Sequence, residues 1–337
     1  MNYKISLLDQ SPVINHESNE DALNRTVELA QDAEKLGYHR FLVSEHHNSS
    51  DVAGSSPEVL VSYLLAKTER IRIGSGGVML QHYSPYKVAE NFHLLTSLAG
   101  DRVDLGIGKA PGGLPLSTKA LQYKNVSSEN DFYERLNLLN QFINNTIPTE
   151  HEFAELEAAP IPNVKPEVIL LGASRESAEQ AAKLGISFAY AQFFNSNDDE
   201  LEAAVKTYRE HFPTGRFILG VNVIASTDER IAKDYASGQT LYKVHLASGK
   251  RLTLIKEEQA EKLGRESGES YRIEKHEPNV ISGTPVQIKE VLDDLHTKLG
   301  VDEFIYHTPV LNSNARNESF KLISPLNLEK LEITLKI

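Results

Sequence analysis

The chain has 337 residues, of which 40% are hydrophobic and none is cysteine. Its 35 basic and 47 acidic residues give a formal charge of −12, which argues against nucleic-acid binding and against a polybasic membrane anchor. No apolar run approaches the ~20 residues of a membrane span, and the N-terminus lacks the apolar segment of a signal peptide. The lack of cysteine excludes disulfides and thiolate chemistry and suits a cytoplasmic protein.

Short apolar segments alternate with helical patterns through the first half of the chain. Strands are predicted at residues 3–8, 40–43, 71–75 and 102–107, and helices at 19–36, 57–67, 86–98 and 131–145. Gly37 directly follows the first of these helices, and Pro57 fits the first turn of the second. Residues 114–130 show no clear period, and we expect them to form a loop over the mouth of a barrel.

The same alternation continues in the second half, after an acidic, proline-containing segment at 146–166 that predicts irregular surface. Strands are predicted at 167–171, 187–190, 217–224 and 303–306. Helices are predicted up to Leu184, with Ser177 and Gln180 as a capping box, and then at 198–211, 228–247, 284–299 and after Asn314. Residues 248–280 are charged and weakly patterned, which is typical of a lid or a disordered loop.

Eight strands that alternate with helices predict a single (β/α)8 TIM barrel over residues 1–337, with a late, mobile insertion at approximately 248–280. In such barrels the functional groups follow the C-terminal ends of the strands. The residues at these ends are small, polar or charged: Asp9, Gln10, Glu45, His46, His47, Gly76, Gly77, Lys109, Ser174 and Ser177. A cation beside glycine and a serine-bearing helix N-terminus together predict an anion site.

Five motifs at these positions resemble those of the bacterial luciferase-like flavin monooxygenases, in the same order and at similar spacing. They are LLDQSP, SEHHN, IGSGGVML, RVDLGIGKAPGG and LLGASRESAEQAAKLG. The resemblance extends over nearly the whole chain and is greatest to non-luminescent bacterial members. It implies a metal-free flavoenzyme that binds reduced flavin mononucleotide (FMN) at the C-terminal face of the barrel.

The resemblance also implies roles for individual residues. Lys109, Ser174 and Ser177 match the positions that bind the flavin phosphate, and Arg175 would add a second positive charge. Gly76 and Gly77 match a non-proline cis peptide under the isoalloxazine ring. His46 matches the catalytic histidine, and Glu45 matches a carboxylate near the flavin. Gly108 stands where luciferases have a cysteine, which argues against light emission.

A mechanism follows from the same resemblance. A separate NAD(P)H-dependent flavin reductase would supply the reduced flavin, or a nicotinamide would reduce it in place. O2 would add at flavin C4a to give a peroxyflavin that oxygenates a small organic substrate in a dry pocket. We expect His46 to act as a general acid and base with a pKa near neutrality, residues 248–280 to close over the site, and the protein to be a homodimer.

Simpler interpretations stand beside these. The Glu45-His46-His47 run could bind a metal, although neighbours on an extended segment point to opposite sides. The glycine pair could be a packing bulge, Lys109 a solvated lysine, and the serines plain helix caps. Two other functions fit the same barrel: a deazaflavin-dependent or flavin-linked dehydrogenase, and a non-enzymatic flavin-binding protein.

Overall fold

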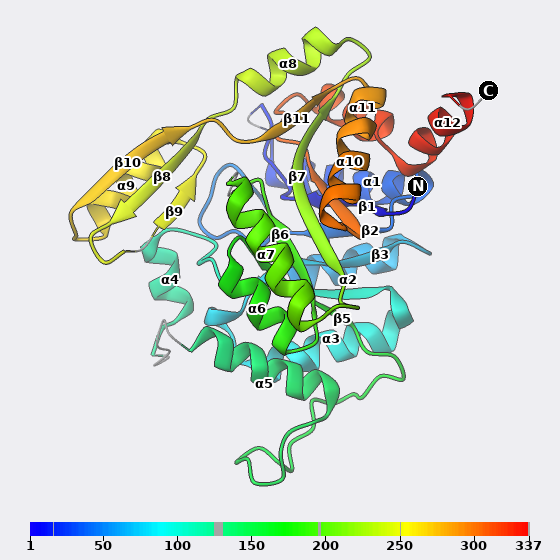
Figure 1. Cartoon of the computed structure of the whole chain (residues 1–337). Coiled ribbons are helices and arrows are strands. Elements are labelled where there is room, and N and C mark those ends of the chain that lie inside the picture. The colour runs from blue at the N-terminus through cyan, green and yellow to red at the C-terminus, as the bar shows by residue number, and fades with distance from the viewer. Residues whose placement is uncertain (16, 125–130, 195–196, 250, 336–337) are drawn as a thin grey trace.

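The computed structural model describes residues 1–15, 17–124, 131–194, 197–249 and 251–335. Eight parallel strands run side by side in the order β7-β12-β1-β2-β3-β4-β5-β6, and β6 pairs again with β7, so the sheet closes into a barrel (Figure 1). The predicted TIM barrel is confirmed. Its strands are β1 (Lys4–Asp9), β2 (Arg40–Val43), β3 (Arg72–Met79), β4 (Val103–Gly108), β5 (Glu167–Gly172), β6 (Ser187–Ala191), β7 (Phe217–Ala225) and β12 (Glu303–His307).

Helices connect successive barrel strands, and the sequence explains where they begin. A capping box of Ser18 and Asp21 opens the first helix, and Thr284 with Gln287 opens the tenth. The connecting helices are α1 (Asn19–Lys35), α2 (Pro57–Lys67), α3 (Pro85–Ala99), α5 (Phe132–Asn144), α6 (Arg175–Lys183), α7 (Asp198–His211) and α10 (Pro285–Leu299). The chain ends with α11 (Ser313–Leu322) and α12 (Pro325–Leu335), and short 3-10 turns lie at Leu80–His82 and Gly100–Arg102.

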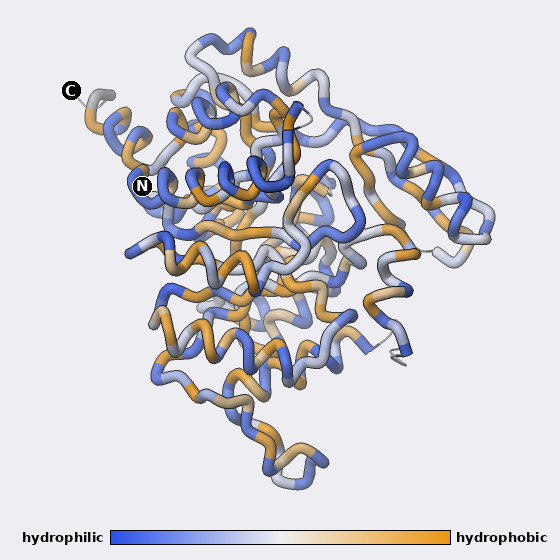
Figure 2. Tube along the Cα trace, turned by 180° about the vertical axis from the view of Figure 1, so that it is seen from behind, coloured by the Kyte–Doolittle hydropathy of each residue, from blue (hydrophilic) through white to orange (hydrophobic). Residues whose placement is uncertain are grey.

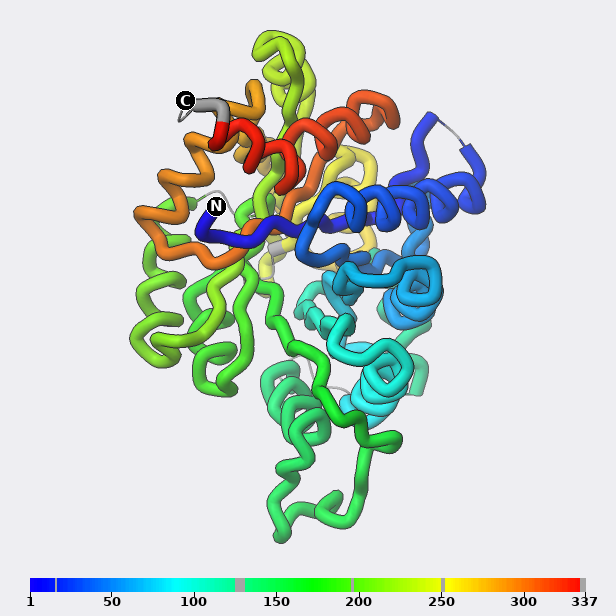
Figure 3. Tube along the Cα trace, turned by 90° about the vertical axis from the view of Figure 1, so that its right-hand side faces the viewer, coloured from blue at the N-terminus to red at the C-terminus, as the bar shows by residue number. Residues whose placement is uncertain are grey.

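Two layers of apolar side chains hold the barrel together. The larger layer fills the space between the strands and the helices. The helices carry alternating hydrophilic and hydrophobic segments (Figure 2). The smaller layer fills the barrel interior and contains Leu8, Leu42, Ile169, Ala189, Ile218 and Ile305. The termini meet on one side of the molecule, where the Met1 ammonium lies 3.5 Å from Glu332 on α12 (Figure 3). No helix within the described ranges is long and apolar enough to cross a bilayer.

The late insertion is an ordered unit that projects from one side of the barrel (Figure 1). After α8 (Glu229–Ser237), strands β8 (Leu241–Leu246), β9 (Arg251–Leu254) and β10 (Tyr271–His276) form an antiparallel sheet in the order β10-β8-β9. Helix α9 (Glu257–Glu266) packs on this sheet, and Val244, Leu246, Ala260 and Leu263 make its own core. Strand β11 (Val280–Gly283) then returns the chain to β7.

Two predictions in this part of the chain are therefore wrong. The helix expected at 228–247 ends at Ser237, and residues 248–280, expected to be a lid or a disordered loop, contain two strands and a helix and so are not a disordered loop; residue 250 lies outside the described residues. The strands are too short for a period to stand out, and their alternate residues bury against α9 only once the sheet has formed. The loop expected at 114–130 contains helix α4 (Pro115–Leu121), and its residues 125–130 lie outside the described part.

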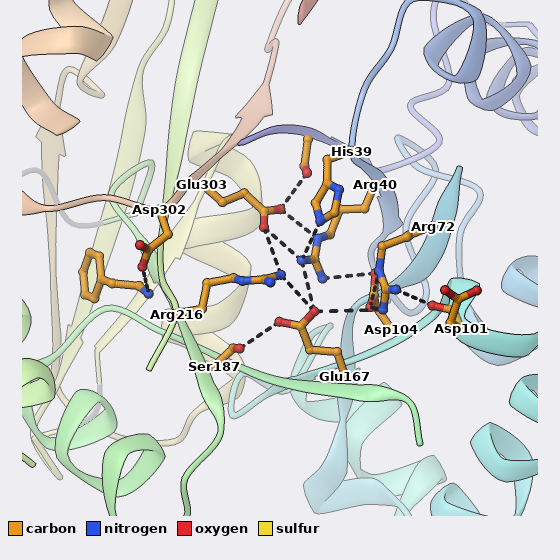
Figure 4. A network of polar contacts seen from close by, with 12 residues as sticks. His39, Arg40, Arg72, Asp101, Asp104, Glu167, Ser187, Arg216, Asp302 and Glu303 are labelled. Atoms are coloured by element: carbon orange, nitrogen blue, oxygen red, sulfur yellow. Dashed lines mark hydrogen bonds and ion pairs between the residues drawn. The ribbon is translucent and has the colours of Figure 1, made fainter. Parts of the chain in front are cut away.

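A network of charged residues closes the barrel at the N-terminal ends of its strands (Figure 4). Arg40 is fully buried, and its guanidinium lies 3.1 Å from Asp104, 2.8 Å from Glu303 and 3.2 Å from Glu167. Arg72 donates to Asp104, and Arg216 donates to Glu167 from the rim of the network. The three arginines balance the three carboxylates. Burial alone would lower the pKa of Arg40, but attraction to these carboxylates outweighs it and raises the pKa.

We expect Arg40→Ala to lower the free energy of unfolding by about 3–5 kcal/mol, because it removes the buried guanidinium that balances Glu303 and leaves Asp104 with Arg72 alone. Urea denaturation followed by circular dichroism measures the change. Arg230→Ala is the control, because Arg230 is 88% exposed and pairs with Asp228 at the surface. The Arg230→Ala variant should lose much less stability than Arg40→Ala, because an exposed ion pair contributes little. Equal losses in the two variants would contradict the structural role of Arg40.

Candidate active site

The predicted site residues lie on neighbouring strands at the opposite, C-terminal end of the barrel. Glu45 and His46 follow β2, the glycine pair lies within β3, Lys109 follows β4, and Ser174 follows β5. Because β2, β3, β4 and β5 are adjacent in the sheet, these residues occupy one arc of the barrel mouth. This is the end at which TIM-barrel enzymes place their functional groups.

The cation and the two serines are joined by a tyrosine that the sequence analysis did not single out. The Lys109 Nζ lies 4.7 Å from the centre of the Tyr133 ring on α5. The Tyr133 hydroxyl lies 3.3 Å from Ser177 Oγ, which lies 3.1 Å from Ser174 Oγ. Three hydroxyls thus meet at the N-terminus of α6, and the ammonium group of Lys109 lies over the ring of the tyrosine that supplies one of them. This donor set suits a phosphate, since the helix dipole adds to the attraction.

The start of α6 differs from the expected capping box. Ser174, not Ser177, is the N-cap residue, and its side chain accepts a hydrogen bond from the Ser177 backbone N–H at 3.2 Å. Gly172 makes this arrangement possible, because a Cβ on that residue would lie 2.6 Å from the Ser177 Cβ. The glycine at the end of β5 therefore lets the helix start close to the strand and brings both hydroxyls to the mouth.

The side chain of Arg175 is not part of this cluster. Its Nε donates to Thr207 Oγ1 on α7 at 3.0 Å, and its backbone N–H donates to Glu200 Oε1 at 2.8 Å. The guanidinium is exposed and directed toward α7. Its contribution to cofactor binding stays a prediction, and the structure gives it partners outside the cluster.

The peptide bond between Gly76 and Gly77 is cis, as the resemblance implies. Packing gives both residues a reason to be glycine. A Cβ on Gly76 would lie 2.7 Å from Leu8 Cδ1 inside the barrel, and a Cβ on Gly77 would lie 2.7 Å from the Gly106 carbonyl on β4. The pairing of β3 with β4 also shifts register between Ser75 and Val78. The glycine pair therefore provides a flat segment of backbone at the mouth, whatever lies against it.

Glu45 is fully buried, and three donors surround its carboxylate. It accepts hydrogen bonds from the Met79 backbone N–H at 2.9 Å, the Tyr83 hydroxyl at 2.8 Å and His47 Nε2 at 2.7 Å. His47 in turn donates its backbone N–H to the carbonyl of Gly112, in the loop that follows Lys109. Glu45 therefore joins the end of β3 to the loops after β2 and β4. Its catalytic role stays a prediction.

His46 is half-buried, and its Nδ1 lies 3.0 Å from Ser44 Oγ. Burial and then the neighbouring His47 lower the pKa of His46 to about 4. The expected pKa near neutrality is therefore wrong, because the folded environment disfavours the charged ring. At pH 7 His46 is neutral, so it can accept a proton and has none to give as a resident acid.

A buried ion pair lies beside these residues and was also missed from the sequence. Arg316 on α11 donates to Asp9 Oδ1 at 2.6 Å, and Thr26 donates to Asp9 Oδ2 at 2.6 Å. Asp9 was among the strand-end residues, but nothing in the sequence connects it with Arg316. The sequence indicated the position of Tyr133 only weakly: this residue lies in the first turn of the predicted helix that follows the Lys109 loop.

Two hollows on the surface lie away from this site. A hollow of about 520 Å³, lined by residues that include Lys4, His39 and Arg72, lies at the N-terminal end of the barrel. A second hollow of about 380 Å³ lies next to it and shares Lys4. Both are adjacent to the buried charge network and lie at the end of the barrel opposite the predicted site residues.

The fold and the position of these residues define the class: a TIM barrel whose polar and charged groups gather at the C-terminal mouth. Residues 1–303 match the family model described as luciferase-like monooxygenase. The chain is 43% identical over 324 residues to N-acetyl-S-alkylcysteine monooxygenase of Bacillus subtilis, covering 95% of this chain and 97% of that protein. It is 32% identical to a luciferase-like monooxygenase of Escherichia coli strain K12, covering 97% of each.

The chain therefore belongs to the luciferase-like monooxygenase family. Solved structures agree with the fold. Apo-MsnO8 superposes with a TM-score of 0.77 at 29% identity, covering 97% of this chain and 98% of that one. The oxygenating constituent of a 3,6-diketocamphane monooxygenase of Pseudomonas putida, solved in complex with FMN, shares the fold with a TM-score of 0.70 at 16% identity.

Proposed function

We propose that this protein is a monooxygenase that uses reduced FMN and O2 to oxygenate a small organic substrate. The observation that carries the proposal is the cluster of Lys109, Tyr133, Ser177 and Ser174, which lies on the same arc of the mouth as the cis glycine pair. Its single ammonium group and three hydroxyls match the hydrogen-bonding needs of a phosphate monoester. A flavin bound there supplies the reducing electrons that activate O2.

The residues around the cluster have separate tasks in this proposal. Lys109 and the hydroxyls hold the phosphate, while Gly76 and Gly77 present backbone without side chains. Neutral His46 takes up a proton during the reaction, since it has a free basic form at pH 7. Leu171 and Phe193 pack against the inner core and provide an apolar wall that excludes water.

The ordered insertion is the proposed cover of the site. Lys256 forms an ion pair with Asp51, in the loop after β2, and Gln259 donates to the other oxygen of Asp51 at 3.2 Å. Leu114, in the loop after β4, packs against the core of the insertion. The insertion thus contacts two of the loops that surround the mouth, so a small displacement would change access to the site.

The proposed substrate class is supported by sequence similarity. At 43% identity over nearly the full length of both chains, the Bacillus subtilis N-acetyl-S-alkylcysteine monooxygenase supports an N-acylated thioether amino acid as the substrate of this protein. Such a molecule has an apolar S-alkyl group for the Leu171 and Phe193 wall. We further propose a separate NAD(P)H-dependent flavin reductase as the source of reduced FMN, and the cytoplasm, which suits a cysteine-free chain, as its location.

A deazaflavin-dependent dehydrogenase is the second candidate, since an F420-dependent secondary alcohol dehydrogenase shares the fold with a TM-score of 0.63 at 13% identity. The two candidates differ in their use of oxygen. Anaerobic titration with reduced FMN, followed by O2 and N-acetyl-S-methylcysteine, should give stoichiometric O2 uptake and a product that carries label from ¹⁸O2. Hydride transfer from reduced deazaflavin without O2 uptake would favour the dehydrogenase. Tight binding of oxidised flavin without turnover would favour a flavin carrier.

We expect Lys109→Ala to weaken FMN binding by about 1.5–3 kcal/mol, because it removes one charge-assisted contact to the phosphate. Equilibrium titration by flavin fluorescence measures the affinity. Lys67→Ala is the matched control, since the Lys67 Nζ also lies over a tyrosine ring, at 5.2 Å from Tyr63, but on α2 away from the mouth. Unchanged affinity in Lys109→Ala would show that the phosphate lies elsewhere.

His46→Ala should retain FMN binding and reduce substrate oxygenation by at least about 100-fold, because it removes the proton acceptor. In the wild type, kcat/KM should decrease as the pH is lowered through about 4. Below this lowered pKa, His46 becomes protonated and its basic form is lost. His211→Ala, at the end of α7, serves as the control. Full oxygenation by the His46 variant would remove its catalytic role.

We also propose a homodimer that forms through α2 and α3. These helices contact each other and expose an apolar face of Val59, Tyr63, Leu94 and Leu98, the last 76% exposed. Helix α2 has apolar residues on all its sides, and a helix of this kind is normally covered on all its sides. A second copy with the same apolar face would cover it on a chain whose net charge of −12 opposes most other self-contacts.

Leu98→Asp should convert the dimer into a monomer at micromolar concentration, because it places a charge in the apolar contact. Sedimentation velocity measures the oligomeric state. Ile231→Asp, at a 49% exposed position on α8, is the control and should remain dimeric. A wild-type protein that sediments as a monomer would rule out this proposal.

A further inference from the structure

His307 is the last residue of β12 and borders the barrel mouth, yet the proposed mechanism gives it no task. Strand β12 lies between β7 and β1, across the mouth from the phosphate cluster on β4 and β5. The ring is half-buried, with the Phe193 ring centre 6.1 Å away. His46 is close enough that its charge would lower the pKa of His307.

The position of the proton on His307 is fixed by its neighbour on β7. Asn222 lies opposite His307 in the strand register, and its Oδ1 lies 2.9 Å from His307 Nδ1. The Asn222 Nδ2 donates to the Asn279 carbonyl at 3.3 Å, which sets the orientation of the amide. An amide oxygen can only accept a hydrogen bond, so Nδ1 of His307 carries the proton.

The other ring nitrogen is consequently an acceptor. Burial and, to a smaller extent, the nearby Arg316 lower the pKa of His307 to about 4, so the ring is neutral at pH 7 and Nε2 has a free lone pair. Among the described residues, none donates a hydrogen bond to this nitrogen. Arg316, a potential donor nearby, is engaged by Asp9 and by the Thr308 carbonyl.

A half-buried acceptor at the mouth is suited to a ligand that brings an N–H group. An N-acylated S-alkyl amino acid has one amide N–H, whereas its thioether sulfur, carbonyl and carboxylate only accept hydrogen bonds. We infer that His307 Nε2 accepts a hydrogen bond from the amide N–H of the substrate and that this contact selects N-acylated substrates over analogues without an N–H group. The inference rests on the proposed function and its substrate class.

The test compares N-acetyl-S-methylcysteine with its ester analogue, in which oxygen replaces the amide N–H. Binding to FMN-loaded protein is measured by calorimetry, and kcat/KM is measured in parallel. We expect the wild type to prefer the amide by at least about tenfold, because a site built to accept a hydrogen bond rejects an analogue that cannot donate one. His307→Phe should bind the two compounds within about threefold of each other.

Two further variants separate hydrogen bonding from packing. His307→Gln keeps an acceptor oxygen and should recover part of the preference. Asn222→Leu leaves the His307 ring in place but removes the acceptor that holds the proton on Nδ1. Either ring nitrogen can then carry the proton, so the preference for the amide should fall in this variant as well. His245→Phe, on the sheet of the insertion where it pairs with Glu274, is the control and should keep the wild-type ratio.

The outcomes distinguish this inference from the function on which it rests. A preference that persists in His307→Phe, or a wild type without any preference, would overturn the role of His307 while leaving a flavin-dependent oxygenation of the amide intact. A wild type that binds FMN but neither binds nor oxidises the amide would overturn the substrate class and this inference with it. A wild type that does not bind FMN would overturn the proposed function itself.

Discussion

The barrel depends on the ion pairs that the buried guanidinium of Arg40 forms with three carboxylates. The guanidinium contacts carboxylates at the starts of β4, β5 and β12, so four strands must begin at the same level for its charge to be balanced. A mispaired strand would leave a charge buried without a partner, which is far more costly than losing a surface contact. The alignment at this end also fixes the level at which the strands end, and hence the positions of the groups at the mouth.

Close contact between β3 and β4 shapes the middle of that mouth. A Cβ on Gly106 would lie 2.1 Å from the Ser75 carbonyl oxygen, and a Cβ on Gly74 would lie 2.5 Å from that of Asp104. Glycine is therefore required on both strands by backbone packing alone. The buried Glu45 carboxylate then binds the Met79 backbone N–H just beyond the glycine pair, so the flat segment and the loop of Lys109 are held by one network.

The mouth has two chemically different sides. The side formed after β4 and β5 has an ammonium group, hydroxyls and a helix N-terminus, and it suits an anion. The side formed by β2, β1, β12 and β7 has two neutral histidines and a charge pair in which Arg316 is already balanced by Asp9. Asn279, at the return of the insertion to the barrel, bonds to the same Asn222 that orients His307, so the insertion supports the second side directly.

The sequence by itself determined the barrel strands, most of the helices and the arc of polar residues at the strand ends, because periodicity, caps and glycines act over a few neighbouring residues. It also indicated the cis glycine pair through family resemblance. Only the tertiary structure decided which distant groups meet. Arg40 meets Glu167 and Glu303, which follow it by 127 and 263 positions, and Asp9 meets Arg316 across a separation of 307 positions. Tyr133 meets both Lys109 and Ser177. The low pKa of His46 and the small sheet of the insertion arise from burial, which no local pattern records.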